Sequence, residues 1–284
     1  MNFNLSRIEV FIVHYSPLLN RLRAQKESFT WKLFSPKIVT ESDCWEEASI
    51  YPFQGDLNLK TKLEIIAQCN DILHILDIHS KAICAGRLRV DSAAPIQSRL
   101  GHDLLLARPY YYQAIYAYSQ KNYDLTLQHI RAMRLFLNTG QDYCLIIEDD
   151  SIPPTNKTLL SFTEEIGRCL DHVYQIHNGY FDISNSFGFH ASGAPDHNDS
   201  ASAFSSMAPG QTRCASAYIL SRGAAQLILS RSQQIVLPVD WHISSILARN
   251  LYPTYWYSRP IFIQGSQHGL FKSNQMIRNS DGSL

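Results

Sequence analysis

The sequence predicts an α/β fold in which one largely parallel sheet carries helices on both faces. Two observations support this prediction. Apolar runs rich in β-branched and aromatic residues alternate with segments whose apolar residues recur every three or four positions. The best defined strand, at 143–147, is apolar at every position, which is typical of a strand buried on both faces of a sheet. With 284 residues, the chain could form one large domain or two small ones.

The chain opens with a strand, a turn and a helix. Residues 7–15 form a β-branched and aromatic run with apolar residues on both faces near its end, as in a buried parallel strand. Ser16 and Pro17 then provide a helix cap and a first-turn proline. Apolar residues at helical spacing continue from there to Phe29, and a second strand is expected at 35–40.

The segment 41–124 has weaker patterns. Its apolar residues suit a helix at 63–76 and a short strand at 83–90, and the prolines and glycine of 91–109 predict a loop.

The second half of the chain has clearer boundaries. Residues 125–137 form an amphipathic helix, and we expect Gly140 to supply a left-handed cap at its end. The apolar strand 143–147 stops at the acidic run 148–150, and a helix follows at 156–170. The remaining predicted elements are a long polar loop at 179–210, a strand at 213–220, a helix at 223–230 capped by Ser221, a helix from 236 to 251 and a last strand at 255–263.

The composition narrows the functional class. Lys and Arg number 25, as do Asp and Glu, and this balance argues against a non-specific nucleic-acid binder. The six cysteines include no C-x-x-C pair, so a reduced, intracellular protein is expected. The N-terminus lacks a signal-peptide pattern, and no apolar stretch approaches the ~20 residues of a spanning helix. We therefore expect a cytoplasmic chain that contacts a membrane at most peripherally, at its inner face.

The acidic run Glu148-Asp149-Asp150 is the sharpest chemical feature of the sequence. Three successive carboxylates repel one another, and the carboxyl edge of an α/β sheet is where ligands bind. Mg²⁺ and Mn²⁺ prefer carboxylate oxygens and share them with substrate phosphates. One acidic residue here would be read as a turn cap, but three after an apolar strand favour a metal site.

Two further segments allow both a structural and a functional interpretation. Asp240 follows Pro238 at a helix start, so it either caps that helix or acts as a base beside Trp241. The segment 264–269, after the last strand, has glycines that allow close backbone approach to a ligand. Its His268 either ligates a metal or contacts phosphate, or the segment is a plain surface loop.

Several common catalytic patterns are missing from the sequence. There is no P-loop, no G-x-G-x-x-G after the first strand, no G-x-S-x-G elbow and no H-E-x-x-H pair. His129, between apolar neighbours on its helix, is interpreted as a satisfied, half-buried histidine rather than a catalytic one. These absences favour an enzyme that handles phosphate through a metal ion.

The order of these segments resembles glycosyltransferase family 25, which comprises lipooligosaccharide-type β-galactosyltransferases and their collagen-modifying relatives. The residues that carry the resemblance are 10–15 with Arg21, the helix 125–132, the strand end 146–150, the segment 217–224 and Pro238-Val239-Asp240. The resemblance is closest from about 125 to 270 and weakest from 41 to 124. One departure is Asn20-Arg21, where family members commonly show Asp-Arg-Arg.

The resemblance implies a single GT-A-like domain with a Rossmann-like sheet over 1–284. Residues 1–124 would be its nucleotide-binding half and 125–284 its metal- and acceptor-binding half. It further implies inverting transfer of a hexose, with galactose expected, from a UDP-sugar to a glycan or glycolipid such as lipooligosaccharide, with Mn²⁺ or Mg²⁺. The implied site residues are Asp240 and Asp150 for catalysis; Asp149, Asp150 and His268 for the metal; and Val13, His14, Tyr15, Arg21, Glu148 and Gln264 for the donor.

Two other functions remain open at this stage. A metal-dependent sugar nucleotidyltransferase also places carboxylates beside a diphosphate, but it releases pyrophosphate. A non-catalytic relative would bind a glycan or nucleotide without turnover.

Overall fold

The fold is described from a computed structural model. The residues it describes are 5–54, 57–58, 60–62, 64, 119–184, 204–207, 212, 214–257, 259–266 and 268–271. Apart from residue 64, the helix, strand and loop predicted between 63 and 109 lie outside these residues, as does most of the predicted loop at 179–210.

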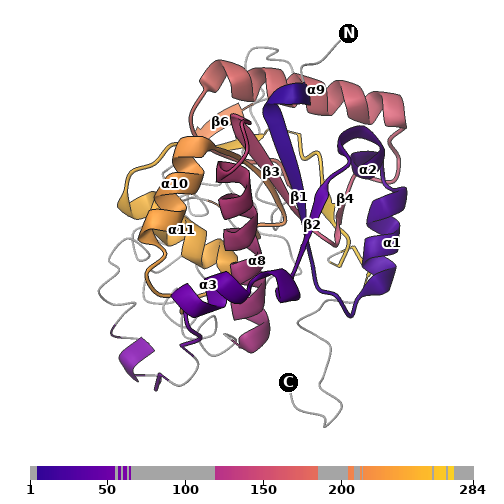
Figure 1. The fold of residues 1–284 in the computed structure, drawn as a ribbon. Helices are drawn as coiled ribbons and strands as arrows, with labels where there is room; N and C mark the ends of the chain where they lie inside the picture. The colour runs from indigo at the N-terminus through magenta and orange to yellow at the C-terminus, as the bar shows by residue number, and fades with distance from the viewer. Residues whose placement is uncertain are drawn as a thin grey trace, which may run out of the picture.

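Seven strands of the described residues form one twisted sheet in the order β2-β1-β3-β7-β5-β8-β6 (Figure 1). Their bounds are Ile8–His14 (β1), Lys37–Thr40 (β2), Tyr143–Glu148 (β3), Tyr180–Asp182 (β5), Phe204–Met207 (β6), Ala217–Ser221 (β7) and Thr254–Tyr257 (β8). Strand β1 runs parallel to β2 and β3, and β5 runs parallel to β8. Strand β7 is antiparallel to β3 and β5, and β6 is antiparallel to β8.

Five of these strands therefore point the same way: β2, β1, β3, β5 and β8. The predicted α/β class with a largely parallel sheet is confirmed, and β7 and β6 are the reversed strands. The carboxyl ends of β1, β2 and β3, which are neighbours, consequently meet at one edge of the sheet, where ligands bind in folds of this type.

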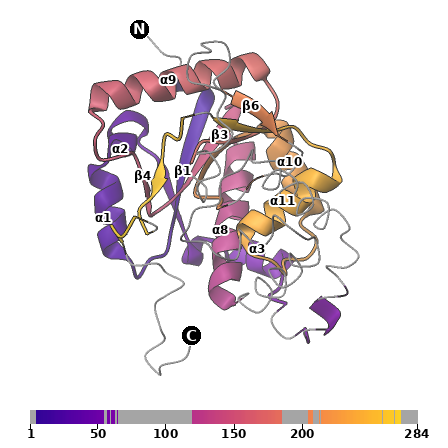
Figure 2. The same cartoon turned by 180° about the vertical axis from the view of Figure 1, so that it is seen from behind.

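Helices cover both faces of the sheet. Their bounds are Leu19–Glu27 (α1), Phe29–Phe34 (α2), Trp45–Ile50 (α3), Gln120–Leu137 (α8), Leu159–Ile176 (α9), Arg222–Arg231 (α10) and Val239–Arg249 (α11), with 3₁₀ turns at Leu5–Arg7 and Glu41–Asp43. Helices α8, α10 and α11 lie side by side in both views, and α1 and α2 lie on the other side of α8 (Figures 1 and 2). No helix in the described part of the chain is both long and apolar enough to cross a membrane.

Strand β3 contributes to two separate cores, one on each face. Cys144 and Ile146 pack in the core beneath α8, α10 and α11, which we call the α8-side core. Leu145 and Ile147 pack in the core beneath α9, the α9-side core. Glu148 is the last residue of β3 and follows this alternation, whereas Asp149 and Asp150 lie in the turn after the strand.

Helix α1 differs from its predicted form. It begins at Leu19 rather than at Pro17, and its N-cap, Leu18, provides no side-chain hydrogen bond. Leu19 is 68% exposed, whereas Arg21 and Gln25 are the buried residues of the helix. The apolar spacing pointed to the wrong face, because this helix docks through hydrogen-bonding side chains.

Several predicted boundaries also change. Helix α8 begins five residues earlier than expected and ends at Asn138 in the right-handed region, so the left-handed cap at Gly140 was wrong. The helix predicted at 156–170 is α9, which starts after a capping bond between Ser161 N–H and the Thr158 hydroxyl. Helix α10 is capped by Ser221, as predicted.

The long loop and the last strand were only partly correct. Strands β5 and β6 lie within the predicted loop. The predicted strand at 255–263 is divided into β8 and a short β9, Ile263–Gln264, which pairs antiparallel with β4, Ser151–Ile152. This small ribbon begins immediately after the acidic run and brings residues 264–266 beside it.

Candidate functional site

The acidic run lies at the carboxyl edge of the sheet, between the ends of β1 and β2 and the β4–β9 ribbon. In β1, His14 pairs with Thr40 of β2, and Val13 pairs with Glu148 of β3. Val13 itself is buried in the α8-side core, so its side chain is part of the core rather than of a ligand site.

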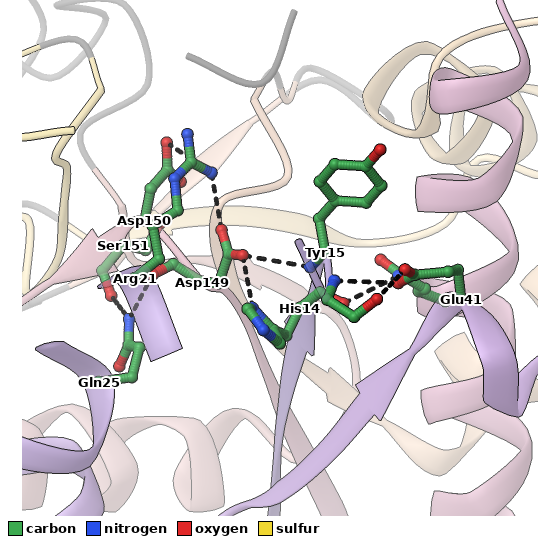
Figure 3. A network of polar contacts seen from close by, with 10 residues as sticks. His14, Tyr15, Arg21, Gln25, Glu41, Asp149, Asp150 and Ser151 are labelled. Atoms are coloured by element: carbon green, nitrogen blue, oxygen red, sulfur yellow. Dashed lines mark hydrogen bonds and ion pairs between the residues drawn. The ribbon is translucent and has the colours of Figure 1, made fainter. Parts of the chain in front are cut away.

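Asp149 is the centre of a buried polar network (Figure 3). Its Oδ1 accepts a hydrogen bond from Arg21 Nη1 at 2.7 Å. Its Oδ2 lies 2.8 Å from His14 Nδ1 and accepts a hydrogen bond from the backbone N–H of Tyr15 at 3.2 Å. Asp149 is 4% exposed, so both carboxylate oxygens are satisfied by groups of the chain rather than by water.

Gln25 extends this network along α1. Its Nε2 donates to the carbonyl oxygens of Ser151, at 2.6 Å, and Asp149, at 3.3 Å. Arg21 and Gln25 are one helical turn apart, so both project from the same face of α1. These hydrogen bonds explain why a polar face of α1 is buried.

Asp150 has a different environment. It is 3% exposed, its carboxylate lies 3.8 Å from Arg21 Nη1, and it accepts a hydrogen bond from Ser266. Its Oδ1 is buried and has no hydrogen-bond partner among the described residues. Burial raises the pKa of Asp150 above its ordinary value, although Ser266 and Arg21 act against this shift.

The turn after β9 packs against Asp150 through its backbone. Gly265 N–H donates to the Asp150 carbonyl at 2.7 Å. A Cβ on Gly265 would lie 2.6 Å from the Phe271 ring and 3.0 Å from that carbonyl oxygen, so a larger residue would require the ring to move. The Oε1 atom of Gln264 is buried without a hydrogen-bond partner in the described part of the chain.

His268 lies beyond this turn and is exposed. Within the described residues, no three His, Cys, Asp or Glu side chains are grouped closely enough to hold a metal ion by themselves. The structure therefore does not join His268 to Asp149 and Asp150 in a preformed cluster.

Glu148 lies on the opposite face from Asp149. Its Oε1 is 3.7 Å from His129 Nε2, which is too far for a hydrogen bond, and His129 Nδ1 lies 2.7 Å from the Tyr218 hydroxyl. Burial lowers the pKa of His129 to about 3, so this histidine is neutral at pH 7. Burial raises the pKa of Glu148 well above its ordinary value, and Asp150, Asp149 and Asp240 raise it further.

Asp240 reaches the same region from α11. The N-cap of this helix is Pro238, so the interpretation of Asp240 as the cap was wrong. Its Oδ2 instead accepts a hydrogen bond from the backbone N–H of Cys214 at 3.3 Å. Cys214 is held in the left-handed region at a φ of 52°. Asp240 is thus anchored to the segment before β7 and contributes to the negative field at Glu148.

Glu41 is a site residue that the sequence analysis missed. It follows β2 directly and accepts hydrogen bonds from the Ser16 backbone N–H at 3.2 Å, from Gln128 Nε2 at 3.3 Å and from the Ser16 hydroxyl. Its position after the second strand of a βαβ unit is where an acidic residue contacts ribose in dinucleotide folds. That position was the available signal, but Glu41 fell in the poorly patterned segment.

Tyr15 stands beside Glu41. In Figure 3 its ring projects away from the Asp149 network, with the hydroxyl at its far end. The ring is half-buried, so one aromatic face is accessible at the edge of the sheet.

The sequence was also compared with known proteins. No model of a known protein family matches the chain, and no curated protein matches it either.

Proposed function

We propose that this chain is a glycosyltransferase that moves a hexose from a UDP-sugar to a hydroxyl of a glycan or glycolipid, with galactose as the expected sugar. One observation carries the proposal. Asp150, Glu148 and Asp240 concentrate negative charge at the carboxyl edge of the sheet, and Asp150 presents a buried oxygen without a partner. Such an excess of carboxylates favours a bound cation and a phosphate-bearing ligand.

Asp150 fits a divalent cation. Mg²⁺ and Mn²⁺ are commonly held by one or two carboxylates with substrate phosphates as further ligands, so a complete protein cage is not required. When bound, the metal supplies positive charge that stabilises the departing diphosphate. Asp150 is the residue that would hold it.

The nucleoside would bind over the ends of β1 and β2. The Tyr15 ring offers a stacking surface for the base, and such rings contribute through their flat apolar faces. Glu41 is placed to accept a hydrogen bond from a ribose hydroxyl.

Asp240 is the proposed general base. It takes the proton of the acceptor hydroxyl while that oxygen forms a bond to the anomeric carbon from the face opposite the diphosphate. The bond from that carbon to the diphosphate oxygen breaks, UDP leaves, and the configuration inverts. The Cys214 N–H orients the Asp240 carboxylate for this step.

The test measures UDP release from a panel of UDP-hexoses with Mn²⁺ and oligosaccharide acceptors. Asp150→Asn and Asp240→Asn are expected to lower transfer at least ~100-fold, the usual contribution of a general base or of electrostatic stabilisation. Asp142→Asn is the matched control. Asp142 pairs with Arg7 just before the first residue of β3, at the end of the strand away from the acidic run, so this variant should keep wild-type activity.

Two results would contradict the proposal. Pyrophosphate release from UTP and a sugar phosphate would instead identify a nucleotidyltransferase. Binding of a nucleotide sugar without UDP release, whatever acceptor is supplied, would identify a non-catalytic relative.

A further inference from the structure

We infer that Asp149 is a positioning residue that holds the donor-binding turn in place, and that it is not a metal ligand. This inference rests on the proposed function and divides the acidic run into residues with separate roles. It starts from the number of hydrogen bonds that the Asp149 carboxylate already accepts.

The Asp149 carboxylate has no free oxygen. Oδ1 accepts from Arg21, and Oδ2 accepts from both His14 and Tyr15. A metal at Oδ2 would have to displace one of its two donors, and a metal at Oδ1 would have to bind beside the positive charge of the Arg21 guanidinium or displace it. Arg21 is 5% exposed, so its displacement would leave a buried guanidinium without its carboxylate, which is strongly unfavourable. Asp150, with one unpartnered oxygen, needs no such displacement.

The donors on Asp149 come from the segments that would contact the donor nucleotide. The Tyr15 amide fixes the backbone that carries the proposed stacking ring. Arg21 fixes the start of α1, and its guanidinium lies 6.0 Å from the centre of the Phe271 ring. Asp149 thereby ties β1 and α1 to β3, while its own oxygens face inward.

His14 completes this attachment. A carboxylate accepts hydrogen bonds, so the 2.8 Å contact requires the proton on His14 Nδ1. The ring is 2% exposed, and its Nε2 has no hydrogen-bond partner in the part of the chain that is described. Through this Nδ1 contact, His14 helps to hold Asp149 in the orientation in which it accepts the Tyr15 amide.

Mn²⁺ binding separates the two aspartates. The titration uses electron paramagnetic resonance of free Mn²⁺, with UDP present, on the full chain and on Asp149→Asn and Asp150→Asn. We expect Asp149→Asn to retain Mn²⁺ binding close to wild type and Asp150→Asn to lose it. Loss of Mn²⁺ binding in Asp149→Asn to the same extent as in Asp150→Asn would overturn the inference.

Kinetics provide the second readout. Asp149→Asn should raise the KM for the UDP-hexose about tenfold, the size expected for one lost charge-assisted hydrogen bond, and leave kcat nearly unchanged. An unchanged KM with a large fall in kcat would contradict a positioning role.

His14 variants test the same attachment if Asp149→Asn folds poorly. His14→Ala removes the donor at Nδ1 and should raise the KM, whereas His14→Asn can place an amide N–H near the same position and should restore it. Equal KM values for the two variants would contradict the inference. If the wild-type chain binds neither Mn²⁺ nor UDP, the proposed function fails; if the wild type binds both and only the variants behave differently from expectation, the positioning role alone fails.

Discussion

Glu148 and Asp149 are neighbours in the chain, but their carboxylates have opposite surroundings. Both oxygens of Asp149 accept hydrogen bonds from buried donors, and Arg21 balances its charge. Glu148 faces the other side of the sheet, where its Oε1 lies 3.7 Å from His129 Nε2, and burial together with the charges of Asp150, Asp149 and Asp240 raises its pKa. The first environment is complete within the protein, whereas the second favours an added cation.

Removing Arg21 takes away the ion-pair partner of Asp149 and should have the largest effect on stability. Arg21→Ala leaves the Asp149 carboxylate buried without its ion-pair partner, and we expect the free energy of unfolding to fall by about 3–5 kcal/mol. Urea denaturation measures this change.

Arg7→Ala is the control for that experiment. Arg7 pairs with Asp142 at the surface and lies over the Tyr174 ring, so its loss should cost much less than the loss of Arg21. Similar losses of unfolding free energy in Arg21→Ala and Arg7→Ala would mean that the buried Arg21–Asp149 pair stabilises the fold no more than a surface pair does.

A substitution at Gly265 tests the contact between the turn after β9 and the backbone of Asp150. In Gly265→Ala the new Cβ meets the Phe271 ring and the Asp150 carbonyl, so we expect a loss of about 1–3 kcal/mol. Thermal unfolding measures it. Gly140→Ala has no atom within 4 Å of its Cβ and should be nearly neutral. A loss in Gly265→Ala no greater than in Gly140→Ala would show that the turn yields without disturbing Asp150.

Glu148→Gln tests the cost of the buried Glu148 charge, and this variant should stabilise the protein. The folded-state pKa of Glu148 is raised, so the folded chain holds a proton that the unfolded chain releases, and stability falls as pH rises from the unfolded value through the folded one. Glutamine cannot ionise, so the variant should be more stable than wild type at neutral pH.

The pH dependence is the decisive part of that prediction. The gain should disappear near pH 4, where the wild-type carboxyl is protonated in both states, and thermal unfolding at both pH values measures the difference. A gain that does not depend on pH would mean that the charge of Glu148 is not its cause.

Much of the sheet and of the acidic edge was predictable from the sequence. The apolar runs of β1 and β3 and the Ser221 cap are local signals, and all three were read correctly. The partners of Asp149 were not predictable, because Arg21 and His14 lie more than a hundred residues away in the chain and reach it only through the parallel pairing of β1 with β3.

Helix α1 shows why the remaining features were missed. Amphipathic reading assumes that a helix docks through its apolar residues, but α1 docks through Arg21 and Gln25, and Leu19 faces solvent. The contacts of Glu41 and the hydrogen bond between Asp240 and Cys214 were missed for a related reason. Glu41 accepts a hydrogen bond from the Ser16 backbone N–H, and Asp240 accepts one from the Cys214 backbone N–H. Both donors are distant in the chain, so no local sequence pattern predicts these contacts.

The register of β3 assigns its odd and even positions to opposite faces of the sheet. Because Tyr143 pairs with Ile8 and Glu148 with Val13, the register turns Glu148 toward His129, on the face opposite the one where His14 meets Asp149. A slip of one residue would exchange these surroundings and send every apolar side chain of the strand to the wrong core. The surroundings of Glu148 are thus set by the packing of the strand that it ends, so a substitution that shifts β3 would also alter the chemistry at the acidic edge.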